Sequence, residues 1–221
     1  MGTDTKNAPS PTQRVGDVFG WREFPHALFY QTDFSLRFDL GADLPTAPVR
    51  FLQAIDRARQ VTDLLFGESE QLTALAGYYD GERRTSRASA SFKALKEMGF
   101  DTSFGPAEQV RQNDARHIAE FGKDLCRYWH AAEFDRNPRL IEALLWASIA
   151  REMPVTPKAR HLESLYIIDF RRGIAACAYD DRGMDVIGIS RTPLQPLYER
   201  FGNWLLDCDR TRMDNIFAPH L

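Results

Sequence analysis

Several sequence motifs that would indicate a function are missing from this chain. It has no glycine-rich phosphate loop and no Gly-x-Ser-x-Gly turn, and its 5 histidines form no pair at helical i, i+3 or i+4 spacing. Its 3 cysteines lie far apart, at Cys126, Cys177 and Cys208, which argues against a disulfide framework or a paired-thiol zinc or redox motif. A Cys–His nucleophile pair would require tertiary proximity. We therefore expect no catalytic residues, no metal and no cofactor.

Strong net charge and long apolar runs are also lacking. A formal charge of −3 leaves no basic face for nucleic acid, and no apolar run approaches the roughly 20 residues that span a bilayer. The first residues are polar and lack the apolar core of a signal peptide. These features predict a cytoplasmic protein with no nucleic-acid and no membrane partner, and they leave its oligomeric state open.

What the chain does contain is a series of strand-like segments. Residues 34–40 alternate strictly, with four apolar side chains on one face and Arg37 and Asp39 on the other, as in a half-buried strand. Residues 165–189 contain three apolar runs separated by glycine-containing turns, which predicts a β-meander. We expect further strands over residues 28–30, 72–79 and 125–134.

Helical patterns separate these strands. Helices are expected over residues 48–66, before Gly99, from Pro138 to Arg151, from about residue 192 to 205, and over 213–217. We predict one buried cluster made of Leu36, Phe38, Leu144, Leu145, Ile167, Leu197 and Phe201. The fold class is α+β, with a mainly antiparallel sheet in a single domain over residues 14–221, after a disordered tail at residues 1–13. Residues 80–122 contain an insertion or a mobile segment.

The charged run from Tyr179 to Asp185 should form the loop between the second and third strands of the meander. One interpretation is structural: Asp180 or Asp181 accepts backbone N–H bonds, and Arg182, the arginine most enclosed by carboxylates, pairs with Asp185 or with the Asp207/Asp209 segment. A second is recognition of a partner protein. A third is a cation site, although the spacing matches no calcium loop.

The histidines do not indicate a functional site more clearly than the acidic run does. His130 lies beside Trp129 in an aromatic segment that is expected to form a strand. We expect it to be partly buried and hydrogen-bonded, without a catalytic role.

Five segments stand out together, in this order: Phe29-Tyr30 with Leu36 to Leu40, Ala58 to Phe66, Leu144 to Trp146, Tyr179 to Asp185, and Leu197-Tyr198 with Trp204 to Asp207. They resemble a bacterial family known only as domain of unknown function 3885. The resemblance covers residues 24–217, is poorest over 80–122, and departs at Cys208, where we expect an aromatic residue. The family brings no settled activity, so the resemblance implies one intact domain.

With no catalytic motif, we expect a non-enzymatic protein-binding domain, and specifically an immunity protein that neutralises a basic toxin domain. Asp180, Asp181, Arg182, Asp185, Asp207 and Asp209 would bind the toxin's arginines, and Tyr179 or Trp204 would supply an aromatic anchor. The alternatives are a metal-dependent hydrolase that uses the Asp180/Asp181/Asp185 loop and a regulatory or scaffold protein.

Overall fold

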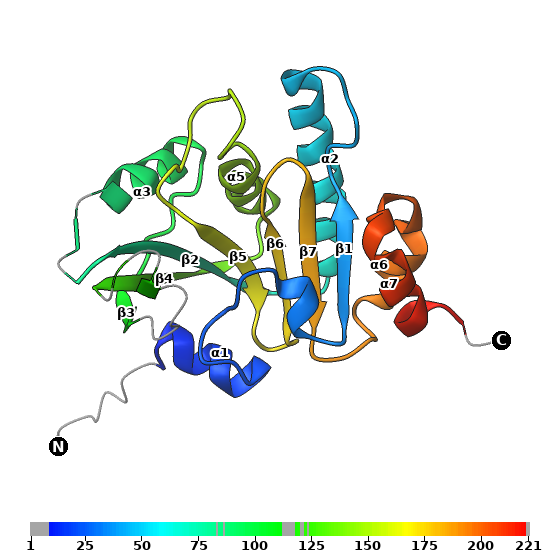
Figure 1. Cartoon of the computed structure of the whole chain (residues 1–221), viewed down its shortest axis with the longest axis horizontal. Helices are drawn as coiled ribbons and strands as arrows, with labels where there is room; N and C mark the ends of the chain where they lie inside the picture. Colours follow the sequence, from blue (N-terminus) through cyan, green and yellow to red (C-terminus); the bar gives the residue numbers. More distant parts are fainter. Residues whose placement is uncertain are drawn as a thin grey trace.

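A seven-stranded antiparallel sheet organises the fold (Figure 1). The computed structural model describes residues 9–82, 84–85, 87–111, 118–119, 122 and 124–219. The predicted α+β class and the β5–β6–β7 meander are confirmed. Across the sheet, the strands are β1 (Ser35–Asp39), β7 (Gly183–Gly188), β6 (Ile174–Ala178), β5 (Ser164–Asp169), β2 (Gln71–Gly81), β4 (Leu125–Asp135) and β3 (Glu108–Arg111).

Both faces of the sheet are covered, but unequally. The larger core receives side chains from α2 (Ala47–Leu65), α3 (Arg87–Glu97), α5 (Pro138–Ile149), α6 (Gln195–Arg200) and α7 (Arg210–Phe217). The smaller core lies under α1 (Pro11–Phe19) and the 3₁₀ turn η1 (Leu28–Gln31). In β5, Leu165 and Ile167 face the larger core, whereas Tyr166 and Ile168 face the smaller one. This two-sided burial explains why the strand is apolar at successive positions.

The predicted core is confirmed. All seven residues named from the sequence, from Leu36 to Phe201, belong to the larger cluster. Helix α5 lies in its middle, capped by Asn137, whose side chain accepts from the N–H of Arg139 at 3.0 Å, and with Pro138 in its first turn.

Two expectations from the sequence are corrected near the N-terminus. Residues 28–30 form the 3₁₀ turn η1 instead of a strand, because the N–H of Phe29 donates to the carboxylate of Asp185 at 3.1 Å and not to a neighbouring strand. Residues 11–13 lie in α1, which Ser10 caps by accepting from the N–H of Gln13. Residues 1–8 of the expected disordered tail lie outside the described residues.

Part of the region that we expected to be an insertion or mobile segment is ordered. Within residues 80–122, α3 and β3 are regular elements, and β3 pairs with β4. Glu108 of β3 accepts from the backbone N–H of Thr12 at 2.9 Å, which ties this edge of the sheet to α1. Residues 83, 86, 112–117, 120 and 121 of that region lie outside the described ranges.

The C-terminal segment covers the free edge of β1. After α6 the chain forms two short 3₁₀ turns, η2 (Gly202–Trp204) and η3 (Asp207–Asp209), before α7. Leu205 forms an isolated bridge with Phe38, and the N–H of Leu206 donates to the carbonyl of Arg37 at 2.9 Å. Pairing of this kind protects an edge strand from other chains. It also brings η3 beside Arg37.

Candidate functional site

The acidic turn between β6 and β7 is buried, and its carboxylates diverge. Asp180 accepts from the backbone N–H and the Nε–H of Arg182, both at 2.7 Å. Asp181 forms an ion pair with Arg50 of α2, without the alignment of a hydrogen bond. Both acids are at most 5% exposed. They stabilise the turn and its contact with α2, as in the structural interpretation.

The expected position of Arg182 is wrong. Its side chain is 74% exposed, and it pairs with Asp180 and Glu152, not with Asp185 or the η3 segment. The turn is so tight that the arginine folds back onto the acid two residues before it. The pKa of Arg182 is raised by that hydrogen bond.

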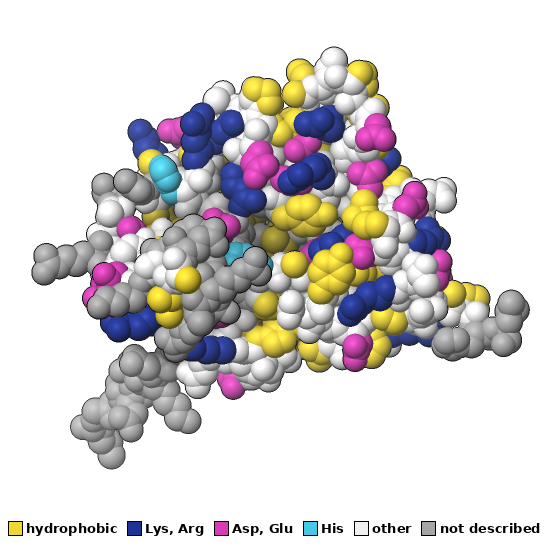
Figure 2. Space-filling view, viewed as in Figure 1, with side chains coloured by type: hydrophobic (Ala, Val, Ile, Leu, Met, Phe, Trp, Pro, Cys, Tyr) yellow, Lys and Arg dark blue, Asp and Glu magenta, His cyan; other side chains and the backbone are white. Residues whose placement is uncertain are grey.

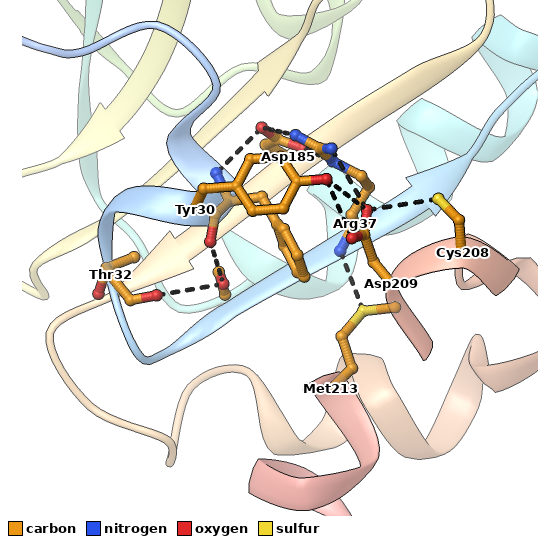
Figure 3. A network of polar contacts seen from close by, with 9 residues as sticks. Tyr30, Thr32, Arg37, Asp185, Cys208, Asp209 and Met213 are labelled. Atoms are coloured by element: carbon orange, nitrogen blue, oxygen red, sulfur yellow. Dashed lines mark hydrogen bonds and ion pairs between the residues drawn. The ribbon is translucent and has the colours of Figure 1, made fainter. Parts of the chain in front are cut away.

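Arg37 of β1 is the arginine that is enclosed by acceptors and aromatic rings (Figure 3). Its Nε and Nη2 donate to the two carboxylate oxygens of Asp185 at 2.7 and 3.0 Å, and Nη1 lies 3.3 Å from Asp209. The side chains of Arg37 and Asp185 are 11% and 3% exposed. Burial is the largest single influence and opposes the charged guanidinium, but the hydrogen bonds to Asp185 and the charge of that carboxylate, with smaller contributions from Tyr179 and Tyr30, together raise the pKa of Arg37.

Aromatic rings surround this guanidinium. Its central carbon lies 4.9 Å from the ring centroid of Phe29, 4.6 Å from that of Tyr30 and 5.7 Å from that of Tyr179. Cation–π contacts of this kind gain strength when the cation is desolvated. The ion pair and the rings therefore fix the positions of η1, β1 and β7 relative to one another.

Tyr30 presents this network to solvent. The residue is 50% exposed, and its hydroxyl donates to Asp209 of η3 at 3.0 Å. Partial burial and the bond to Asp209 raise the pKa of the phenol, so it remains a donor at neutral pH. Figure 2, viewed from the side of α1 and η1, shows hydrophobic side chains gathered near the middle of this face among acidic and basic ones. The structure thus holds a large exposed aromatic side chain in one orientation.

The surface beside Tyr30 is acidic. Asp33 and Asp207 are exposed and make no ion pair within the described part of the chain. A shallow hollow of about 580 Å³ lies next to them, lined by Asp33, Cys208, Asp209, Thr211, Arg212, Asn215 and Ile216. We call the exposed residues Tyr30, Asp33 and Asp207, together with Asp209, the Tyr30 surface.

The two aromatic residues expected to be anchors, Tyr179 and Trp204, are packed against the protein and are not exposed as Tyr30 is. Trp204 is half-buried, and its ring stacks on Phe201 with centroids 4.7 Å apart. Tyr179 is also half-buried, and its ring packs so closely on Gly183 that a Cβ atom there would lie 2.5 Å from the Cζ atom of the tyrosine. Both rings are engaged in packing and offer a partner less area than Tyr30.

A second feature brings a cysteine and a histidine to one cavity. A cavity of about 120 Å³ lies where β5 begins and β6 ends, and its lining includes His26 and Cys177. Arg151 bridges the two strands there by donating to the carbonyls of Glu163 and Tyr179. Burial raises the pKa of Cys177 to about 12, and Nε2 of His26 lies 2.8 Å from the hydroxyl of Tyr79. The thiol therefore stays protonated and is not prepared as a nucleophile.

Metal ligands do not gather in the described residues either. No group of three or more His, Cys, Asp or Glu side chains there could hold a metal ion. In the acidic turn the reason is clear, because Asp180, Asp181 and Asp185 each face a different guanidinium.

Comparison with known proteins places the chain in a family. The family model described as Domain of unknown function (DUF3885) matches residues 12–209. The chain belongs to this family. No curated protein and no solved structure matches it significantly. The match to DUF3885 covers β1, the acidic turn and η3, so the Arg37 network lies wholly inside it. None of the helices in the described ranges combines the length and apolar character that crossing a bilayer requires.

Sequence reasoning missed the two residues at the centre of this site, Tyr30 and Arg37. Alternation places Arg37 on the face of β1 opposite Leu36 and Phe38, and it predicts that the face carrying Arg37 meets water. The available signal was the aromatic pair Phe29-Tyr30 shortly before the strand, since these residues cover that face in the structure.

Proposed function

We propose that this protein acts by binding another protein, and that the Tyr30 surface is the centre of the contact. The observation that carries the proposal is the fixed, half-exposed ring of Tyr30, held by Asp209 and lying over Arg37. Tyrosines dominate binding hot spots, and an aromatic side chain that is already ordered loses little conformational entropy on binding. The Arg37 network supplies that order.

The charge of this surface favours a basic partner. Asp33, three residues after Tyr30, and Asp207, two residues before Asp209, add two exposed carboxylates, and complementary charges speed association and select the partner. Of the acids expected from the sequence, Asp207 and Asp209 are retained in this proposal. Asp180, Asp181 and Asp185 support the surface from within.

The partner we propose is a toxin domain with a basic face, which the protein neutralises in the cytoplasm as an immunity protein. The rigid acidic surface supports this role, and the bacterial origin that the sequence resemblance implies is consistent with it. Neutralisation by covering a toxin requires no catalytic group, and it requires nanomolar binding or better, or about −12 kcal/mol.

Two other roles compete with this proposal. A regulatory or scaffold protein would use the same Tyr30 surface, and co-expression distinguishes it because such a protein protects against no toxin. A metal-dependent hydrolase would need the three turn carboxylates to converge, whereas each already has its own arginine. We therefore do not favour the hydrolase.

The first test is co-expression with the product of the gene immediately upstream. We expect that product to stop growth alone and to be harmless together with this protein. If it is harmless alone, or kills equally in both cases, the immunity role is wrong.

The second test locates the surface by titration calorimetry with the purified partner. Tyr30→Ala should weaken binding at least about 30-fold. Leu52→Ala is the matched control, because Leu52 is 67% exposed on α2, and it should leave the affinity unchanged. Asp33→Asn with Asp207→Asn should slow association and reduce its salt dependence. If Tyr30→Ala binds as tightly as the wild type, the contact surface lies elsewhere.

A further inference from the structure

A separate hollow lies on the face of the sheet that carries α3, opposite η1 and Tyr30. It is formed by α3, β4 and the segment that follows α3. It encloses about 270 Å³. Three phenylalanines form much of its wall: the rings of Phe92 and Phe104 have centroids 4.9 Å apart, and those of Phe100 and Phe104 are 5.5 Å apart. The other lining residues are Lys96, Thr102, Ser103, Gly105 and His130.

His130 places a buried polar side chain beside these aromatic rings. The residue is 9% exposed, and its Nδ1 lies 2.8 Å from the carbonyl oxygen of Gly105. A carbonyl can only accept, so Nδ1 carries the proton. Burial lowers the pKa of His130, and the ring is therefore neutral at pH 7. Nε2 is then an acceptor.

That acceptor has no donor. Nε2 is buried and has no hydrogen-bond partner within the described residues. His130 is thus partly buried and hydrogen-bonded, as expected from the sequence, but only through Nδ1. The ring cannot turn easily to find a donor for Nε2, because Tyr78 stacks on it at 5.8 Å and Phe92 meets it edge-on at 4.9 Å. A buried acceptor left unpaired is unfavourable and calls for a specific explanation.

A ligand in the neighbouring hollow would supply the missing donor. A cavity of about 150 Å³ lined by apolar side chains is large enough for benzene, so this hollow can accept one substituted ring. We propose that it binds a small phenol-like molecule, whose ring packs among Phe92, Phe100 and Phe104 and whose hydroxyl donates to Nε2 of His130. Because Nε2 is buried and Phe92 packs edge-on against the imidazole at 4.9 Å, the hydroxyl reaches Nε2 only after phenylalanine rings move aside. Phe92 and Phe104 are partly exposed, so their rings have solvent to move into.

The test compares two probes that differ in the hydroxyl group, 4-methylphenol and toluene, added to the full-length protein. Binding is followed by the ¹⁵N resonance of His130 Nε2, which reports directly on a donated hydrogen bond. We expect 4-methylphenol to shift this resonance and to bind at least about tenfold more tightly than toluene. His130→Phe keeps a flat ring, and it should bind the two probes equally. The control His161→Gln changes a histidine that does not line the hollow and should keep the preference.

The proposal is overturned if the wild-type protein binds the two probes equally or not at all, or if 4-methylphenol leaves the Nε2 resonance unmoved. These outcomes are read on the wild-type protein, so they hold even if His130→Phe does not fold. Tyr30→Ala should bind 4-methylphenol normally. The hollow and the Tyr30 surface can therefore fail or succeed independently.

Discussion

At the scale of single residues, two arginines near the acidic turn have equally buried carboxylate partners but differ in their own burial: the side chain of Arg37 is 11% exposed and that of Arg182 is 74% exposed. Arg37→Met would leave the carboxylate of Asp185, now 3% exposed, without its countercharge, which should cost about 3–5 kcal/mol. Arg182→Met, the matched control, removes a side chain that is 74% exposed. Asp180 is itself 3% exposed, but water can fill the place that the exposed guanidinium leaves, and the backbone N–H of Arg182 still donates to Asp180. The cost should therefore be smaller, about 1 kcal/mol. Urea unfolding measures both, and equal costs would contradict the assignment of Arg37 as the central cation.

A glycine at the start of β7 gives a second prediction. A Cβ atom on Gly183 would lie 2.5 Å from the Cζ of Tyr179 and 3.1 Å from the carbonyl oxygen of Phe38. Gly183→Ala should therefore force the ring away from Arg37 and destabilise the fold by about 1–3 kcal/mol. Gly81→Ala is the control, because no heavy atom lies within 4 Å of its Cβ position. If thermal melts of the two variants coincide, the close packing of Tyr179 does not matter for stability.

The same residues show how far sequence reasoning reaches at this scale. Leu36 and Phe38 were predicted correctly as core because alternation within one strand determines the face. What covers Arg37 depends on Asp185 and Asp209, which lie 148 and 172 residues away in sequence. Local patterns carry no information about such pairs. The sequence therefore predicts Arg182, which has acids on both sides in the chain, as the arginine most enclosed by carboxylates, whereas in the structure that arginine is Arg37.

At the scale of elements, α5 shows most directly how burial stabilises the fold. Leu144 is 1% exposed in the larger core, so Leu144→Ala should cost about 2–5 kcal/mol, through lost burial and the cavity left behind. Leu52→Ala makes the same substitution in α2 at a position that is 67% exposed and should change stability by less than about 0.5 kcal/mol. Chemical denaturation of both variants would test this, and a small effect at Leu144 would mean that α5 is peripheral.

Elements with a clear period were predicted, and those shaped by tertiary contacts were not. The alternation of residues 34–40 and the Asn137-Pro138 start of α5 are local signals, and both appear in the structure. Residues 28–30 have strand-like composition, yet their path follows the hydrogen bond from Phe29 to Asp185. Ser10 and Pro11 are a local helix-start signal that the polar composition around them concealed.

At the scale of the whole molecule, the two ends of the chain meet on one sheet. β1 pairs with β7, and the segment after α6 bridges to β1, although the intervening chain forms the rest of the sheet. No local pattern specifies this strand order. It is the reason that a tyrosine from η1 and an aspartate from η3 can form one surface.

The sheet lies between the two hydrophobic cores, and we therefore expect the whole molecule to unfold in one transition. Val186 and Ile187 are neighbours in β7, both fully buried, but Val186 belongs to the larger core and Ile187 to the smaller one. Because the five inner strands of the sheet, from β7 to β4, contribute side chains to both cores, neither core should melt alone. Val186→Ala and Ile187→Ala should each lower the melting temperature, by roughly 2–4 °C per kcal/mol lost. In both variants the transitions followed by far-ultraviolet circular dichroism and by tryptophan fluorescence should still coincide. A split transition in Ile187→Ala alone would show that the layer of α1 and η1, which carries Tyr30, unfolds independently of the rest.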